Sequence, residues 1–530
     1  MYKRFRFAFL MLGGAGIGAA SLCGADWLTH SGDPQRTGWQ QAESTITKDN
    51  VKDFQLLWKL TLPDNEQKAL HSLMEPLIVG RIITNRGFKE VALVAGSSDN
   101  LYAVDADLGK ILWQKHFQYS SETPQSTTSF WLCPGGLTAT PVVPSAPIPR
   151  PGGSVAGRPP PSVRGIYLLS SDGQLHQMNL ANGEDLAPPA KFVPPNGKPY
   201  SLNVVDNVIY TTTGQHCGGV PNSVWALNLA DMKVSSWTSN GGGLWGLAGA
   251  AVGTDGTVYA EVGDGNWDPA KGIYSDTFVA LEPKTLKLND WYTPSNREWI
   301  TKRDLDMNVT PVVFPYMGRD LLAGSGKEGR LYLLDSKSLG GENHRTPLFR
   351  TQLISNEDVD FAGRGTWGSL ASWQDATGTR WVLAPVWGPL HPEMKFPITN
   401  GDAPEGSIVA FKVEESNGKT VLTPGWVSRN LVIPAPPVIA NGVVFALSSG
   451  EYVRQANENQ GGLFSPEQRA KLSTHAILYA LDAATGKELY SSGDAITSFT
   501  HFAGMAVANG RVYFSTFDNT LYSFGFPLEH

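Results

Sequence analysis

Residues 478–487 read Leu-Tyr-Ala-Leu-Asp-Ala-Ala-Thr-Gly-Lys. The first five form an aromatic and aliphatic run that ends in an acidic residue, which is typical of a short β-strand followed by a turn. Similar runs recur along the chain at spacings of 43 to 77 residues, beginning at residues 101, 175, 224, 278, 331, 408, 478 and 521. Such a recurrence indicates a protein built from repeated structural units.

Each repeat carries further strand-like segments around this run. In the clearest copies a Gly-Lys turn and another strand follow, as in Gly109-Lys-Ile-Leu-Trp113, and an apolar segment such as Gly442–Ala446 precedes. About four strands per repeat, repeated eight times, predict an all-β fold, an eight-bladed β-propeller with four-stranded blades. A parallel β-helix needs shorter, more even periods, and an α/β barrel needs helices between its strands.

The two ends of the chain are predicted to meet in one blade. The last run ends at Gly525, five residues before the C-terminus, so no outer strand can follow it. The segment Leu56-Leu-Trp-Lys-Leu60 is similar to Ile111-Leu-Trp-Gln114, which follows the first run. We therefore expect an N-terminal strand to complete the last blade and close the ring.

The composition excludes several classes of protein. The 57 Gly and 36 Pro among 530 residues are spread along the chain, which indicates many turns. A formal net charge of −7 leaves no basic stripe for a nucleic acid. With 41% hydrophobic residues the chain is too apolar to be disordered, and Lys, Glu and Ala do not dominate as in a coiled coil.

Residues 1–25 are predicted to be a signal peptide, and residues 26–530 a single propeller domain. Lys3, Arg4 and Arg6 precede an apolar stretch, and small residues lead to a cleavage site after Ala25. Acylation of Cys23 and a membrane anchor are the alternatives, although an anchor needs roughly 20 apolar residues. We expect an exported protein, periplasmic or extracellular, without a transmembrane span in the mature chain.

Cys133 and Cys217 are the cysteines left after such cleavage, and both lie in Gly-rich segments. A disulfide in an oxidising compartment and two buried free thiols are both compatible with this pattern. The sequence has no zinc-ligand spacing and no Cys-x-x-Cys-His haem motif. The longer repeats contain insertions at residues 144–164, 388–405 and 450–473, which we expect to form loops over one face.

Residues 478–487 resemble the repeat of the pyrroloquinoline quinone (PQQ) propeller family, and the resemblance covers nearly all of residues 26–526. The opening Trp27–Trp39 also resembles the start of many members. This family contains quinoprotein alcohol and polyvinyl-alcohol dehydrogenases, and also non-catalytic outer-membrane assembly scaffolds. The repeat is specific for the fold and says little about chemistry.

Three residues match cofactor-binding positions of the dehydrogenase branch. The resemblance implies that Trp245 stacks on the quinone, that Asn266 helps to hold calcium, and that Lys327 reaches the quinone oxygens. Trp367 is a further candidate near the axis. The alternatives are blade-packing tryptophans, a turn asparagine and a solvated lysine.

Two expected carboxylates are missing. Cys217 occupies the position of the calcium-binding glutamate, which argues against calcium, and Lys271 occupies that of the catalytic aspartate. Asp276 and Asp264 are nearby carboxylates that could replace the catalytic base. Two hypotheses follow: a PQQ-dependent dehydrogenase of alcohols or polyols that passes electrons to a separate acceptor, and a non-catalytic scaffold that binds a protein or glycan in the cell envelope.

Overall fold

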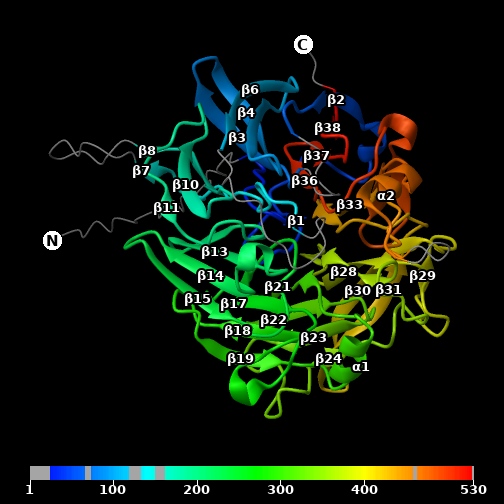
Figure 1. The fold of residues 1–530 in the computed structure, drawn as a ribbon. Helices are drawn as coiled ribbons and strands as arrows, with labels where there is room; N and C mark the ends of the chain where they lie inside the picture. Colours follow the sequence, from blue (N-terminus) through cyan, green and yellow to red (C-terminus); the bar gives the residue numbers. More distant parts are fainter. Residues whose placement is uncertain (1–23, 66–72, 118–132, 150–161, 457–461, 528–530) are drawn as a thin grey trace, which may run out of the picture.

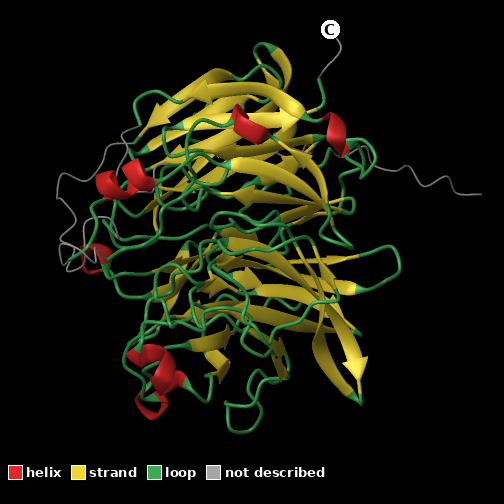
Figure 2. Ribbon diagram, turned by 90° about the vertical axis from the view of Figure 1, so that its right-hand side faces the viewer, coloured by secondary structure: helices red, strands yellow, loops and turns green. Residues whose placement is uncertain are grey.

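The computed structural model describes residues 24–65, 73–117, 133–149, 162–456 and 462–527. Within these residues the strands form eight sheets of three or more strands, arranged around a common centre in chain order (Figure 1). Figure 2 shows that strands make up most of the body and that helical turns are confined to the loops. The predicted all-β, eight-bladed propeller is confirmed.

The blades follow one another along the chain. The first four comprise β3–β6 (Leu77–Thr84, Gly87–Gly96, Asn100–Asp105, Lys110–His116), β9–β11 (Gly165–Leu169, Gln174–Asn179, Ala190–Lys191), β12–β15 (Asn203–Val205, Val208–Thr213, Ser223–Asn228, Lys233–Thr238) and β16–β19 (Ala251–Val252, Val258–Val262, Thr277–Leu281, Leu288–Tyr292). The last four comprise β21–β24 (Val312–Tyr316, Arg319–Ser325, Leu331–Asp335, Phe349–Arg350), β27, β28, β30 and β31 (Ala371–Gln374, Arg380–Trp387, Gly406–Ser416, Lys419–Val427), β32–β35 (Val438–Ala440, Val443–Ser448, Ile477–Asp482, Glu488–Ser491) and β36–β38 with β2 (Ala506–Ala508, Arg511–Ser515, Thr520–Gly525, Gln55–Thr61).

The second blade departs from the predicted four strands. Its sheet has three, and the innermost position is reduced to a single bridge between Val142 and Tyr167. Short strands outside the blade order are β1 (Trp39–Gln40), β7 (Ile148–Pro149), β8 (Ser162–Val163), β20 (Val309–Thr310), β25 (Gly365–Thr366), β26 (Gly368–Ser369) and β29 (Ile398–Thr399). β7 and β8 pair within the predicted 144–164 insertion, of which residues 150–161 lie outside the described part.

The ring closes as predicted. Strand β2 pairs antiparallel with β38, with Gln55 opposite Gly525 and Thr61 opposite Thr520. Strand β1 adds a parallel pairing with β32, so the N-terminal segment reaches two neighbouring blades. Closure leaves no sheet of the ring without a neighbour, which removes the need for capping repeats.

Tryptophans on outer strands join one blade to the next. Trp58 of β2 donates its indole N–H to the Ala106 carbonyl at 2.9 Å, and its ring covers the turn at Gly109. A Cβ at Gly109 would lie 2.7 Å from that ring, and the φ of +62° also requires glycine. Trp113 with Gly183 and Trp426 with Gly486 repeat this arrangement. The Gly of the repeated turn therefore serves the packing between blades.

Cys133 and Cys217 form a disulfide, with their Cα atoms 5.6 Å apart. It joins the segment before the second blade to the loop after β13, and both residues are buried. Residues 1–23 of the predicted signal peptide lie outside the described residues. Among the described residues, no helix has the length and apolar character to cross a membrane; α1 (Arg297–Lys302) and α2 (Pro466–Leu472) are both short.

Candidate functional site

Segments before the first strand and after the second strand of several blades meet on one face of the ring. In an antiparallel blade, the first strand starts and the second strand ends at the same edge of the sheet. Lys198 and Trp245 precede β12 and β16, whereas Gln215 and Lys327 follow β13 and β22. All four side chains line one central cavity of about 200 Å³.

The cavity combines flat aromatic walls with charged side chains. Trp367 and Trp387 stack with ring centres 4.8 Å apart and an interplanar angle of 12°, and Phe502 stacks on Trp387 at 5.8 Å. The side chains with ionisable groups that line it are Lys198, Asp304, Lys327, Glu451, Arg469 and His501. Flat walls and a few polar groups are typical of a site for a small planar ligand.

Lys327 occupies a central position in this wall. Its ammonium lies 5.3 Å from the ring centre of Trp245 and 5.1 Å from that of Trp367. It is held by Asp306 at 2.6 Å and Asp304 at 3.0 Å. Burial lowers the pKa of Lys327, but attraction to these two carboxylates outweighs it and keeps the pKa above its usual value. The side chain is therefore a fixed positive charge between two indoles.

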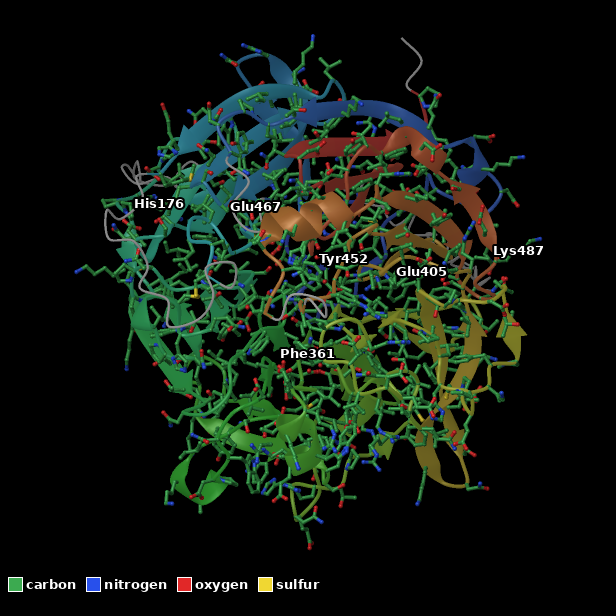
Figure 3. All side chains as sticks on the ribbon, turned by 45° about the vertical axis from the view of Figure 1, so that its right-hand side comes forward. His176, Phe361, Glu405, Tyr452, Glu467 and Lys487 are labelled. Atoms are coloured by element: carbon green, nitrogen blue, oxygen red, sulfur yellow. A yellow bond between two sulfur atoms is a disulfide. The ribbon has the colours of Figure 1, made fainter. Side chains whose placement is uncertain are left out.

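A second charged group comes from the insertion at residues 450–473. Glu451 accepts a hydrogen bond from Arg469 at 2.6 Å, and its other oxygen lies 2.8 Å from Nδ1 of His501. Arg469 lies on α2 and also donates to the Tyr452 carbonyl at 3.1 Å. Figure 3 shows Tyr452 close to this helix, whose first turn is marked by Glu467. The predicted loop therefore contributes to the cavity, through a short helix that the sequence pattern did not predict.

The structure brings three of the predicted cofactor residues together. Trp245, Lys327 and Trp367 line the same cavity. Asn266 does not join them, because it is exposed and is not part of the cavity wall. The candidate metal ligand and the candidate cofactor residues are thus in different places.

Neither predicted base lines the cavity. Asp276 is fully buried, accepts a hydrogen bond from Thr301 and lies 3.7 Å from Arg297. Burial raises the pKa of Asp276 to about 7. Burial likewise raises the pKa of Asp264, a half-buried side chain beside Asp304 and Asp306. The carboxylate bound to Lys327 that does reach the cavity is Asp304, which no sequence motif indicated.

The residues present do not fit calcium held in the manner that the family resemblance implies. The sulfur of Cys217 is bonded to Cys133, and the exposed Lys271 pairs with Asp268. Carboxylate oxygens of Asp264, Asp304 and Asp306 lie within 4.8 Å of one another. The ammonium of Lys327 already binds two of these three carboxylates, so the protein supplies its own cation there.

Lys198, Asp304, Asn308 and the Glu451–Arg469–His501 group were not found from the sequence. The signal that could have found most of them is positional, since Lys198, Asp304, Asn308 and His501 lie before first strands and Glu451 follows a second strand. Arg469, on α2 between a second and a third strand, has no such signal. The Asn308 amide is buried against the cavity and has no hydrogen-bond partner among the described residues. Such a group calls for a ligand or water partner.

No family model matches the chain, and no curated protein matches it either. Solved structures resemble it over nearly its whole length. The quinohemoprotein alcohol dehydrogenase from Comamonas testosteroni aligns with a TM-score of 0.55 and 15% identity, covering 95% of this chain and 82% of that one. The chain has the fold of the quinoprotein dehydrogenases.

Two further structures support this assignment of the fold. A quinohemoprotein alcohol dehydrogenase from Pseudomonas putida HK5 has a TM-score of 0.56 and 14% identity, with 98% of this chain and 84% of that chain covered. A europium-containing methanol dehydrogenase has a TM-score of 0.56 and 13% identity, with 95% and 98% covered. The predicted resemblance to PQQ-type propellers is confirmed at the level of fold, which by itself does not assign an activity.

Proposed function

We propose that the protein binds PQQ in its central cavity and uses it to oxidise an alcohol or polyol. The observation that carries this proposal is the position of Lys327, whose ammonium lies about equally far from the ring centres of Trp245 and Trp367 on the wall of the cavity. PQQ is a planar quinone that carries carboxylates and carbonyl oxygens. Its flat face suits the indoles, and its oxygens suit the cation and the amide of Asn308.

When bound, PQQ would accept two electrons from the alcohol carbon. Lys327, held in place by Asp304 and Asp306, would stabilise negative charge on an oxygen of the ligand. Asp304 is the carboxylate of this wall nearest to that charge and is our candidate for accepting the alcohol proton. Asp264 clusters with Asp304, and neither Asp264 nor Asp276 lines the cavity, so we assign both an electrostatic role.

A non-catalytic scaffold that binds a protein or glycan partner is the second candidate. Two observations favour it: Cys217 is committed to a disulfide and Lys271 is exposed, where the resemblance implies the calcium glutamate and the catalytic aspartate. We further propose that residues 1–25 direct export to the periplasm or the exterior. The Cys133–Cys217 disulfide supports this location, because disulfides persist in oxidising compartments.

The test is a titration of the purified protein with PQQ, followed by quenching of tryptophan fluorescence, alongside reduction of an artificial dye with a panel of alcohols. Saturable binding that Trp245→Ala and Lys327→Met both weaken, together with dye reduction, is the expected result. Binding without dye reduction favours the scaffold. Absence of binding overturns the proposal. Trp237→Ala, on the outer strand of the third blade, serves as a matched control.

A further inference from the structure

Lys198 is a buried lysine whose charge nothing in the described structure neutralises. It lies in the segment before β12, lines the central cavity and a small adjoining one, and is 7% exposed. Its ammonium lies 5.5 Å from the ring centre of Tyr200. Among the described residues no carboxylate, hydroxyl or carbonyl binds this ammonium, in contrast to the other cations of the wall.

Those other cations are paired. Lys327 binds Asp304 and Asp306, and Arg469 binds Glu451. Proteins rarely bury an ion without a partner, because the lost hydration is not replaced. Burial lowers the pKa of Lys198 to about 8, because the buried ammonium has lost its hydration and gained no ionic partner. A positive charge at the cavity wall therefore lacks its counterion.

We infer that Lys198 is the anion-binding residue of this cavity and that the ligand places a carboxylate on its ammonium. The ligand class is a planar aromatic carboxylate, whose ring lies against the indoles while its carboxylate reaches across to Lys198. For PQQ this inference rests on the proposed function. Binding of a carboxylate by Lys198 does not involve the quinone group, so it can be tested separately from quinone chemistry.

Three probes distinguish binding of a carboxylate by Lys198 from binding of the quinone. PQQ has both carboxylates and a quinone, naphthalene dicarboxylate has carboxylates without a quinone, and phenanthrolinedione has a quinone without carboxylates. Each is titrated into the full mature protein, with tryptophan fluorescence and equilibrium dialysis as readouts. The variants are Lys198→Met, which keeps the length without the charge, and Lys198→Arg, which keeps the charge. Lys271→Met, at an exposed pair, is the control.

Lys198→Met should weaken binding of both carboxylate probes about 10- to 100-fold, as expected for one charge-assisted hydrogen bond, and leave phenanthrolinedione unaffected. Lys198→Arg and Lys271→Met should bind like the wild type. If neither carboxylate probe distinguishes Lys198→Met from the wild type, or if that variant loses all three probes equally while retaining its circular dichroism and melting temperature, the inference is wrong. Binding of naphthalene dicarboxylate but not PQQ would overturn the proposed function and leave the inference standing.

Discussion

The ammonium of Lys327 lies 2.6 Å from a carboxylate oxygen of Asp306, and both side chains are buried. The pair joins the segment before β20 to the loop after β22, so it also fixes two parts of the cavity wall relative to each other. Asp304 holds the same ammonium from the more exposed side. One buried cation thus serves the stability of the fifth blade and the chemistry proposed for the site.

Asp306→Ala should lower the free energy of unfolding by about 1–3 kcal/mol, because it removes one of the two charge-assisted hydrogen bonds of the buried ammonium while Asp304 still binds it. Denaturation by urea measures this loss. Asp268→Asn, which breaks the exposed pair with Lys271, should leave stability unchanged within error. The double variant Asp306→Leu with Lys327→Met should recover most of the loss, and a double variant no more stable than Asp306→Ala contradicts the pairing.

Gly109→Ala should weaken the junction between the closing strand and the first blade. The new methyl would meet the Trp58 ring at 2.7 Å with a backbone φ of +62°. Gly272→Ala is the matched control, because its φ is +71° and a Cβ there meets nothing within 4 Å. We expect the control to cost about 1 kcal/mol from the backbone alone and Gly109→Ala about 2–4 kcal/mol, measured by urea denaturation. Equal costs would show that Trp58 does not pack on this turn.

Glu75 makes stability depend on pH. It lies 3.2 Å from Nε2 of His30, yet burial raises the pKa of Glu75 from 4.5 to about 8 and lowers that of His30 from 6.5 to about 3. Near pH 7 both are neutral, so the contact is a hydrogen bond from the protonated carboxyl group to the imidazole.

Between pH 4.5 and pH 8 the folded protein keeps a proton on Glu75 that the unfolded chain has released. Glu75 alone should therefore make stability fall as the pH rises, by up to about 1.4 kcal/mol per pH unit. The lowered pKa of His30 has the opposite effect up to about pH 6.5, so we expect the net fall between about pH 6.5 and pH 8. Glu75→Gln removes the titration while keeping an oxygen acceptor for the Trp27 indole. Urea denaturation between pH 6.5 and pH 8 should show a flatter profile for the variant than for the wild type, and parallel profiles in this range would contradict the assignment.

Binding of PQQ should not require calcium. The ammonium of Lys327 already binds two of the three clustered carboxylates, and the position of the expected calcium glutamate is a disulfide sulfur. The dissociation constant should be the same in a chelator and with added calcium. An affinity that rises tenfold or more with calcium would show that the metal displaces Lys327 from Asp264, Asp304 and Asp306.

The fold was predictable because its evidence is repeated along the chain. Each of the eight runs lies in the third position of a blade, so an error in one copy does not change the architecture. The site was only partly predictable. Trp245, Lys327 and Trp367 were found through motifs, whereas Asn266 shares a motif with Asp264 and yet its side chain lies at the surface. A motif specifies a turn, and the packing of neighbouring turns decides which side chain faces the axis.

By itself, the sequence determined the number of blades, the closure of the ring by β2 and the positions of the turns, because strand periodicity and turn residues are local properties. The tertiary structure alone decided that Cys133 meets Cys217, that Lys327 is paired and that Lys198 is not. These relations join residues from different blades or loops, and their energies depend on burial and distance, which no local pattern encodes. The chemistry of the cavity therefore depends on contacts across the ring.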